Sequence, residues 1–253
     1  MRERTDERET PSLRWALVIA ALIVVGVRNF VPFGRYVLYP FTLLATWVHE
    51  MGHGLTGLAT LGRFDRLEVF ADASGLAHGA AGAPWAEGLR AMGGLLAPPI
   101  LGTLLLVVAR GPKRATVALW VLAAVIAISV PIWVRSVTGW IALPAVALAI
   151  GAFAWRMGPT SRLIGAHFLA VLFGLDTVTR IDYLFKSSVI VDGRPRPSDV
   201  AIVAEALGGH WLLWGILLAL VSLALLGLGV WITWRGPKPL ARPSPETPAR
   251  QSR

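Results

Sequence analysis

The chain has 253 residues, of which 55% are hydrophobic and only 15% are charged. A soluble domain typically carries about a quarter charged residues, so this composition is typical of a protein that crosses a membrane several times. The formal charge of +9 lies mainly in short loops and at the termini, which favours membrane lipid as a partner and argues against nucleic-acid binding.

Seven apolar segments follow a polar N-terminal segment, residues 1–12, and define a membrane domain over residues 13–234. They lie at about 13–27, 41–61, 89–109, 115–134, 139–155, 163–175 and 211–234. A helix needs about 20 apolar residues to cross the hydrocarbon, with a lower limit near 17, so the first and sixth segments are short. The sequence therefore predicts an all-α membrane protein with six or seven transmembrane helices. The first segment has no small-x-small cleavage site and is expected to remain as a span.

The stretch 63–75 has a different pattern from its apolar surroundings. Leu67, Val69 and Ala71 alternate with more polar positions, and Ala73-Ser74-Gly75 ends the run. A period of two residues closed by a turn predicts a short β-hairpin-like insertion after the second apolar segment, with an irregular loop as the alternative.

The C-terminal residues 235–253 are basic and contain five prolines. They have no apolar face, so we predict a disordered basic tail. Basic residues also gather in the loops after the third and fifth apolar segments, which fall on the same side as the tail if four spans follow Arg114. The positive-inside rule then predicts a cytoplasmic tail, although four basic residues between Asp176 and Asp199 argue against this orientation.

The second apolar segment contains His49-Glu50-Met51-Gly52-His53. Four helical steps of roughly 100° bring His49 and His53 onto nearly the same face, where both imidazoles can bind one zinc ion. Glu50 lies about 100° around the helix, close enough to act as general base and acid on a zinc-activated water. Because the chain has no cysteine, any metal must be held by His, Asp or Glu.

The surroundings of this motif strengthen the zinc hypothesis. An ionisable group inside a transmembrane segment costs several kcal/mol unless it has a partner, so such groups mark functional sites by default. The alternative is the water-exposed end of an interfacial helix. Pro40 fits the first turn of this helix, and Gly52, Gly54 and Gly57 leave a thin face that a neighbouring helix or a substrate backbone can approach.

A His-Glu-x-Gly-His motif inside a transmembrane helix resembles the site-2-protease-like zinc metallopeptidases, particularly their short bacterial branch without a PDZ domain. Weaker matches are the strand ending in Ala73-Ser74-Gly75, Gly88-Leu89-Arg90 before Gly93-Gly94, and Ser198-Asp199-Val200-Ala201 before the last span. The resemblance covers the chain from Phe41 to that span. It implies an intramembrane zinc peptidase in a bacterial plasma membrane, with a transmembrane protein as substrate.

The resemblance also implies a third zinc ligand, because relatives supply an aspartate from a later helix in a Leu-Asp-Gly motif preceded by Asn and Pro. This chain has Leu175-Asp176-Thr177 without that upstream pattern, and Asp182 resembles the aspartate of the short branch. Both Asp176 and Asp182 therefore stand as candidates. Asp199 is a third candidate, but its expected role is to cap a helix that begins near Val200.

The sequence thus predicts a membrane-embedded zinc metallopeptidase that cuts a transmembrane or juxtamembrane peptide bond, with Glu50 as the catalytic residue and His49, His53 and either Asp176 or Asp182 as metal ligands. Two alternatives remain. One is a non-proteolytic scaffold or binding protein that keeps the peptidase fold, which the missing Asn-x-x-Pro pattern favours. The other is a small transporter that uses Glu50 and Asp176 as ion sites.

Overall fold

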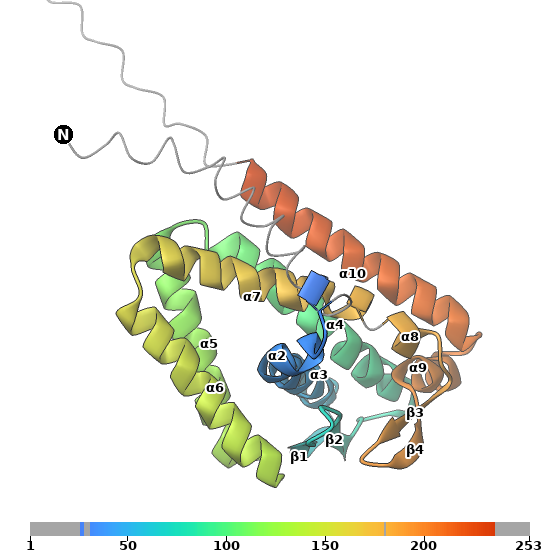
Figure 1. Cartoon of the computed structure of the whole chain (residues 1–253). Helices are drawn as coiled ribbons and strands as arrows, with labels where there is room; N and C mark the ends of the chain where they lie inside the picture. Colours follow the sequence, from blue (N-terminus) through green and yellow to red (C-terminus); the bar gives the residue numbers. More distant parts are fainter. Residues whose placement is uncertain (1–25, 28–30, 180, 236–253) are drawn as a thin grey trace, which may run out of the picture.

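Helix α3 (Tyr39–Ala59), which carries the motif, lies in the interior of a helical assembly (Figure 1). The computed structural model describes residues 26–27, 31–179 and 181–235. Pro40 occupies the first turn of α3, as expected, and the short helix α2 (Gly34–Val37) precedes it. The segments 1–25 and 236–253, with most of the first predicted span and nearly all of the predicted tail, lie outside the described residues.

Helix α4 (Pro84–Val108) is the centre of the packing and has extensive contacts with α3, α7 (Pro159–Thr179) and α10 (Trp211–Trp234). Glycines allow the closest approach, because a Cβ at Gly52 of α3 would overlap the backbone carbonyl of Gly93 on α4. The thin face predicted on α3 is therefore filled at this position by a neighbouring helix.

Helices α5 (Pro112–Trp133) and α6 (Val137–Arg156) pack against each other on the far side of α3 from α10 (Figure 1). Within the described residues four helices, α4, α5, α6 and α10, are long and apolar enough to cross a membrane. The protein is therefore an integral membrane protein of the expected all-α class with small β insertions.

The structure does not confirm the predicted count of six or seven spans. Helices α3 and α7 are 21 residues long but are not among the four helices apolar enough to span. Their ionisable residues lower their hydropathy: α3 carries the motif, and α7 carries Arg162, His167 and Asp176. Both helices thus combine spanning length with polar side chains, as expected for elements that build a buried site.

The predicted insertion after the motif helix is an antiparallel hairpin of β1 (Arg63–Val69) and β2 (Gly75–Ala80). Phe64, Leu67 and Val69 are buried, so one face of β1 joins the core. Gly54 of α3 faces the ring of Phe64, where a Cβ would overlap the ring, and so lets the hairpin lie directly on the motif helix.

A second hairpin follows α7 and the short helix α8 (Ile181–Leu184), and it was not predicted. It consists of β3 (Ser188–Val191) and β4 (Arg194–Pro197), and α9 (Asp199–Leu207) comes next. Asp192-Gly193 forms its two-residue turn, with positive φ at both residues, which is a strong short-range hairpin signal. Both hairpins lie at the same end of the helical assembly (Figure 1).

Candidate metal centre

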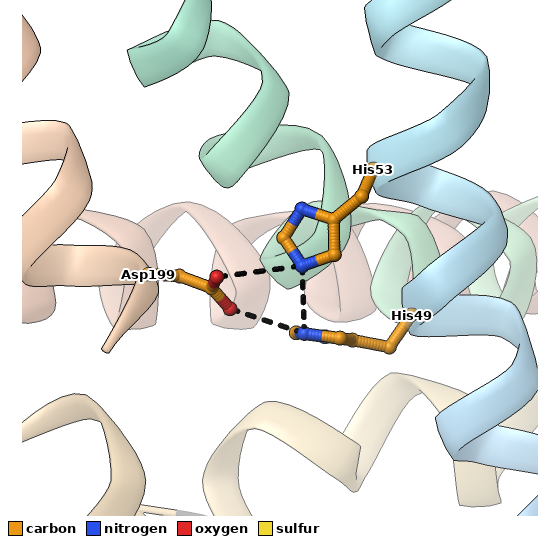
Figure 2. Close-up of side chains that lie close together, drawn as sticks. All are labelled: His49, His53 and Asp199. Atoms are coloured by element: carbon orange, nitrogen blue, oxygen red, sulfur yellow. Dashed lines mark hydrogen bonds and ion pairs between the residues drawn. The ribbon is translucent and has the colours of Figure 1, made fainter. Parts of the chain in front are cut away.

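The two motif histidines point to one place. Both lie on α3 one turn apart, and their Nε2 atoms are 3.1 Å from each other (Figure 2). The ring of His53 is nearly perpendicular to the ring of His49, so the two nitrogens converge while the rings do not stack. His53 is buried, which excludes the alternative of a helix end that faces water.

Asp199 completes the cluster from the first turn of α9. One carboxylate oxygen lies 3.1 Å from Nε2 of His49, and the other lies 3.4 Å from Nε2 of His53 (Figure 2). The expectation that Asp199 caps this helix was wrong. Ser198 is the cap: its hydroxyl accepts from the amide of Ala201 and donates to the carbonyl of Lys186. Since the preceding serine satisfies the helix end, the aspartate carboxylate is available to the histidines.

The three donors fit a tetrahedral zinc site. They form a group of His49, His53 and Asp199 whose ligand atoms all lie within 4.8 Å of one another. In a tetrahedron with bonds of about 2.0–2.1 Å, neighbouring ligand atoms are roughly 3.3 Å apart. The measured separations of 3.1, 3.1 and 3.4 Å are close to that value. Two imidazoles and one carboxylate are also a donor set that catalytic zinc sites use, with the fourth position left to water or substrate.

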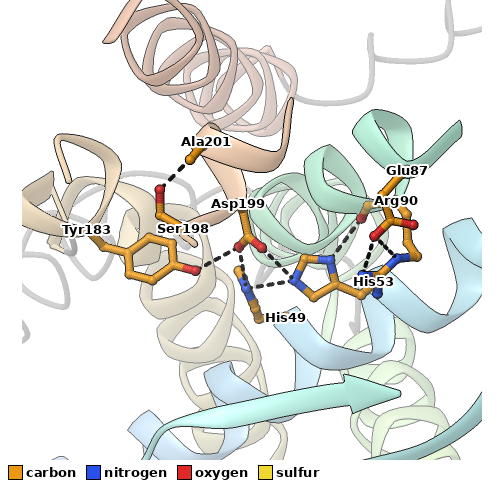
Figure 3. A network of polar contacts seen from close by, with 8 residues as sticks. All are labelled: His49, His53, Glu87, Arg90, Tyr183, Ser198, Asp199 and Ala201. Carbon is orange, nitrogen blue, oxygen red and sulfur yellow. Dashed lines mark hydrogen bonds and ion pairs between the residues drawn. The ribbon is translucent and has the colours of Figure 1, made fainter. Parts of the chain in front are cut away.

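Hydrogen bonds outside this triangle orient the donors (Figure 3). Nδ1 of His53 lies 2.8 Å from the backbone carbonyl of Arg90, which can only accept, so Nδ1 donates and Nε2 faces the centre. The hydroxyl of Tyr183 donates to Asp199 at 2.9 Å. Glu87 in turn holds the guanidinium of Arg90. Such outer partners fix the orientation of metal ligands and their tautomers.

The electrostatics keep the aspartate ionised. Burial alone would raise the pKa of the Asp199 carboxyl, but the charge that His53 can carry and hydrogen bonds from both imidazoles lower this pKa below its usual range. Burial and the negative charge of Asp199 raise the pKa of Tyr183 well above its ordinary value. Tyr183 therefore stays a neutral hydroxyl donor, and a cation is stabilised where the three ligand atoms converge.

Glu50 lies beside the cluster on the wall of a cavity of about 260 Å³ that also contains His49. The side chain is only 5% exposed and makes no hydrogen bond to any residue that the structure describes. A Cβ at Gly75 would lie 2.6 Å from its Oε1, so the absence of a side chain at Gly75 leaves the room that this carboxylate needs. Glu50 is thus positioned to exchange protons with a molecule in the cavity.

The two aspartates predicted as third ligands do not join the cluster in the described part of the chain. Asp176 is buried on α7 and lines the same cavity as His49 and Glu50, but the group of converging donors does not include it. Asp182 belongs to α8, and its side chain lies outside the described part. The ligand roles of Asp176 and Asp182 stay predictions, whereas the geometry brings Asp199 to both imidazoles. One signal in the sequence was missed. Ser198 and Asp199 are both good N-cap residues, but only one residue can cap a helix, so the other carboxylate or hydroxyl is left for another partner.

A buried cluster of two histidines and a carboxylate, with an adjacent glutamate on a cavity wall inside an integral membrane protein, defines the class of intramembrane metallopeptidase-like proteins. The family comparison agrees, since residues 15–229 match the family described as Peptidase M50B-like. The chain therefore belongs to this peptidase family, which confirms the resemblance to site-2 proteases. No match was found among curated proteins or among solved structures.

Proposed function

We propose that the protein is a membrane-embedded zinc metallopeptidase that hydrolyses a transmembrane or juxtamembrane peptide bond. The observation that carries this proposal is the convergence of His49, His53 and Asp199 beside the Glu50 carboxylate on one cavity wall. Membership of a peptidase family supports the reaction type. The substrate is then a membrane protein, because the site lies among helices long and apolar enough to span a bilayer.

Each residue has a defined task in this proposal. His49, His53 and Asp199 would hold the zinc ion, with Asp176 and Asp182 kept as alternative third ligands. When bound, zinc lowers the pKa of a coordinated water to about 7 and polarises the substrate carbonyl. Glu50 would accept the proton of the attacking water and deliver it to the leaving amine. A helical substrate must unwind before attack, because its carbonyls are otherwise hydrogen-bonded within the helix.

One feature of the chain favours a second candidate, a non-proteolytic protein that binds zinc or membrane partners through the same fold. Leu175-Asp176-Thr177 lacks the upstream Asn-x-x-Pro of the related peptidases. This candidate predicts one tightly bound zinc and no cleavage, whereas the less favoured transporter predicts no zinc at all.

The test uses the full chain in proteoliposomes together with fluorescent single-span peptides of varied sequence. We expect cleavage by the wild type and one zinc per chain. Glu50→Gln should keep the zinc and lower the cleavage rate by about 10²–10⁴-fold, because it removes only the proton acceptor. His49→Ala should lose both zinc and activity. If the wild type binds zinc that His49→Ala loses, but cleaves none of the peptides, the non-proteolytic candidate would be established instead.

A further inference from the structure

The second hairpin forms part of the wall of the metal-site cavity. Val189, Ile190 and Val191 of β3 line this cavity together with His49 and Glu50. The tip of the hairpin reaches the turn of the first hairpin, where the amide of Asp192 donates to the hydroxyl of Ser74 at 3.4 Å. Both the β3–β4 hairpin and the turn of the first hairpin are therefore placed to contact a molecule in the cavity beside Glu50.

The register of the hairpin decides which side chains share the cavity face. Val189 pairs with Arg196, and Val191 pairs with Arg194. Directly opposite residues of an antiparallel pair project from the same face. All three residues line the cavity, but Val189 and Val191 are partly buried whereas Ile190 between them is 63% exposed, so the valine face is the more buried face of the hairpin. Arg194 and Arg196 therefore lie on the valine face of the hairpin, beside residues that line the cavity although they do not line it themselves, and we call this pair the basic rim.

The two prolines of β4 leave only one edge of this hairpin open. The pair that closes a two-residue turn is hydrogen-bonded, so the pairs Ile190–Pro195 and Ser188–Pro197 are the non-hydrogen-bonded ones. Pro195 and Pro197 have no N–H to offer at the outer edge of β4, which blocks strand addition there. The backbone polar groups of Ile190 point away from β4, at the open edge of β3, and Ile190 is one of the residues that line the cavity.

The two arginines of the basic rim have no ion-pair partner among the residues that the structure describes. Both arginines are exposed. The cavity itself is lined by the carboxylates of Glu50, Asp72 and Asp176. An acidic group is therefore repelled from the interior of the cavity and attracted to its β4 rim.

We propose that the substrate lies as an extended segment along the open edge of β3 and that Arg194 and Arg196 bind acidic side chains flanking the bond that is cut. This proposal rests on the peptidase function and names its substrate class, a membrane protein with Asp or Glu next to the cleavage site. An acidic peptide is favoured over a lipid headgroup because the arginines share a face with Val189 and Val191, which line the cavity that contains Glu50.

The test compares two single-span peptides that are identical except beside the cleavage site. One carries Asp or Glu on both sides of the site, and the other carries Asn or Gln at the same positions. In zwitterionic vesicles the wild type should cleave the acidic peptide with a kcat/KM about 10-fold higher, as expected for two partly exposed charge pairs. Arg194→Gln/Arg196→Gln should bring this ratio close to 1 with zinc content unchanged. The double variant Arg194→Glu/Arg196→Glu should cleave best a third peptide, which carries Lys or Arg at the same positions. Misfolding cannot produce such a gain of activity.

The matched control is Lys113→Gln/Arg114→Gln, which removes two exposed cations at the start of α5, outside the cavity, and should leave the ratio unchanged. A wild type that cleaves neither peptide would overturn the peptidase function and the rim subsite together. Equal cleavage of both peptides would overturn the subsite alone. Phosphatidylglycerol in the vesicles could instead change kcat/KM equally for both peptides, in a way that requires the two arginines. That result would assign the rim to lipid binding and would also overturn the peptide subsite.

Discussion

Helix α3 and the β1–β2 hairpin form one wall of the metal-site cavity, whereas α8, β3 and the first turn of α9 stand on the other side of the site. The first wall is anchored in the core. Phe64 stacks on Trp133 with ring centroids 5.0 Å apart, and Leu67, fully buried, accepts a hydrogen bond from the amide of Arg135. The amide of Val69 donates to the hydroxyl of Ser136 at 2.9 Å.

The second wall has fewer such anchors. No described side chain of the β3–β4 hairpin is fully buried, and its tip is joined to the first hairpin by the long contact between Asp192 and Ser74. Yet this side supplies Asp199, Tyr183 and the basic rim. The anchored wall thus carries His49, His53 and Glu50, whereas the less anchored wall supplies the Asp199 carboxylate that meets both imidazoles and the hairpin for which we propose substrate contact.

The largest effect is expected when the second wall loses its proposed metal ligand, Asp199. Asp199→Asn should lower zinc affinity and cleavage by about 100-fold or more, because it replaces the only anionic ligand with a neutral amide. Asp176→Asn is the matched control, an isosteric change on the same cavity, and should leave the zinc in place. Metal analysis of both purified variants decides the ligand. Loss of zinc in Asp176→Asn alone would show that α7, not α9, completes the site.

Tyr183→Phe should have the next largest effect. It removes the hydroxyl that donates to Asp199 but leaves the ring beside His49. Loss of an outer partner of a metal ligand typically lowers metal affinity or activity by about 10–100-fold. Zinc competition with a chelator measures the affinity. An unchanged affinity would show that Asp199 is held by α9 alone.

Where α4 packs on the anchored wall, Gly94→Ala should destabilise the protein by about 1–3 kcal/mol, because a Cβ there would overlap the ring of His53. Gly227→Ala on α10 is the matched control, since nothing lies within 4 Å of its Cβ position and alanine favours a helix. Thermal unfolding in detergent compares the two variants. A similar stability for both would mean that the α3–α4 contact can relax around His53.

The smallest effect is expected for Ser74→Ala, which removes the contact between the two hairpin tips together with the exposed hydrogen bond from the Ser74 hydroxyl to Asp72. The bond is long and exposed, so its loss should change the free energy of local opening by about 0.5–1 kcal/mol. Faster hydrogen exchange at the Asp192 amide, with unchanged exchange in β1, would confirm that the tips are joined here. Equal acceleration in both hairpins would show that the first wall depends on the second.

The membrane class and the part of the site that lies on one helix could be predicted from the sequence, and the first hairpin was one of two structures that it allowed. His49, Glu50 and His53 are adjacent in the chain, and a helical spacing of four residues dictates that the histidines share a face. The alternation around Leu67 and Val69 likewise predicts a strand without reference to any other segment. The motif helix and the strand could be predicted because each depends only on the periodicity of its own segment.

The third donor was decided by the tertiary structure. Asp199 and Asp176 are both aspartates near helix ends, and only the packing of α9 against α4 and of α4 against α3 selects the one that reaches the imidazoles. The role that we propose for Arg194 and Arg196 depends in the same way on register, which places them on the face of Val189 and Val191. Local propensity carries no information about such long-range geometry, because distances across the fold are set by close packing of elements far apart in the chain.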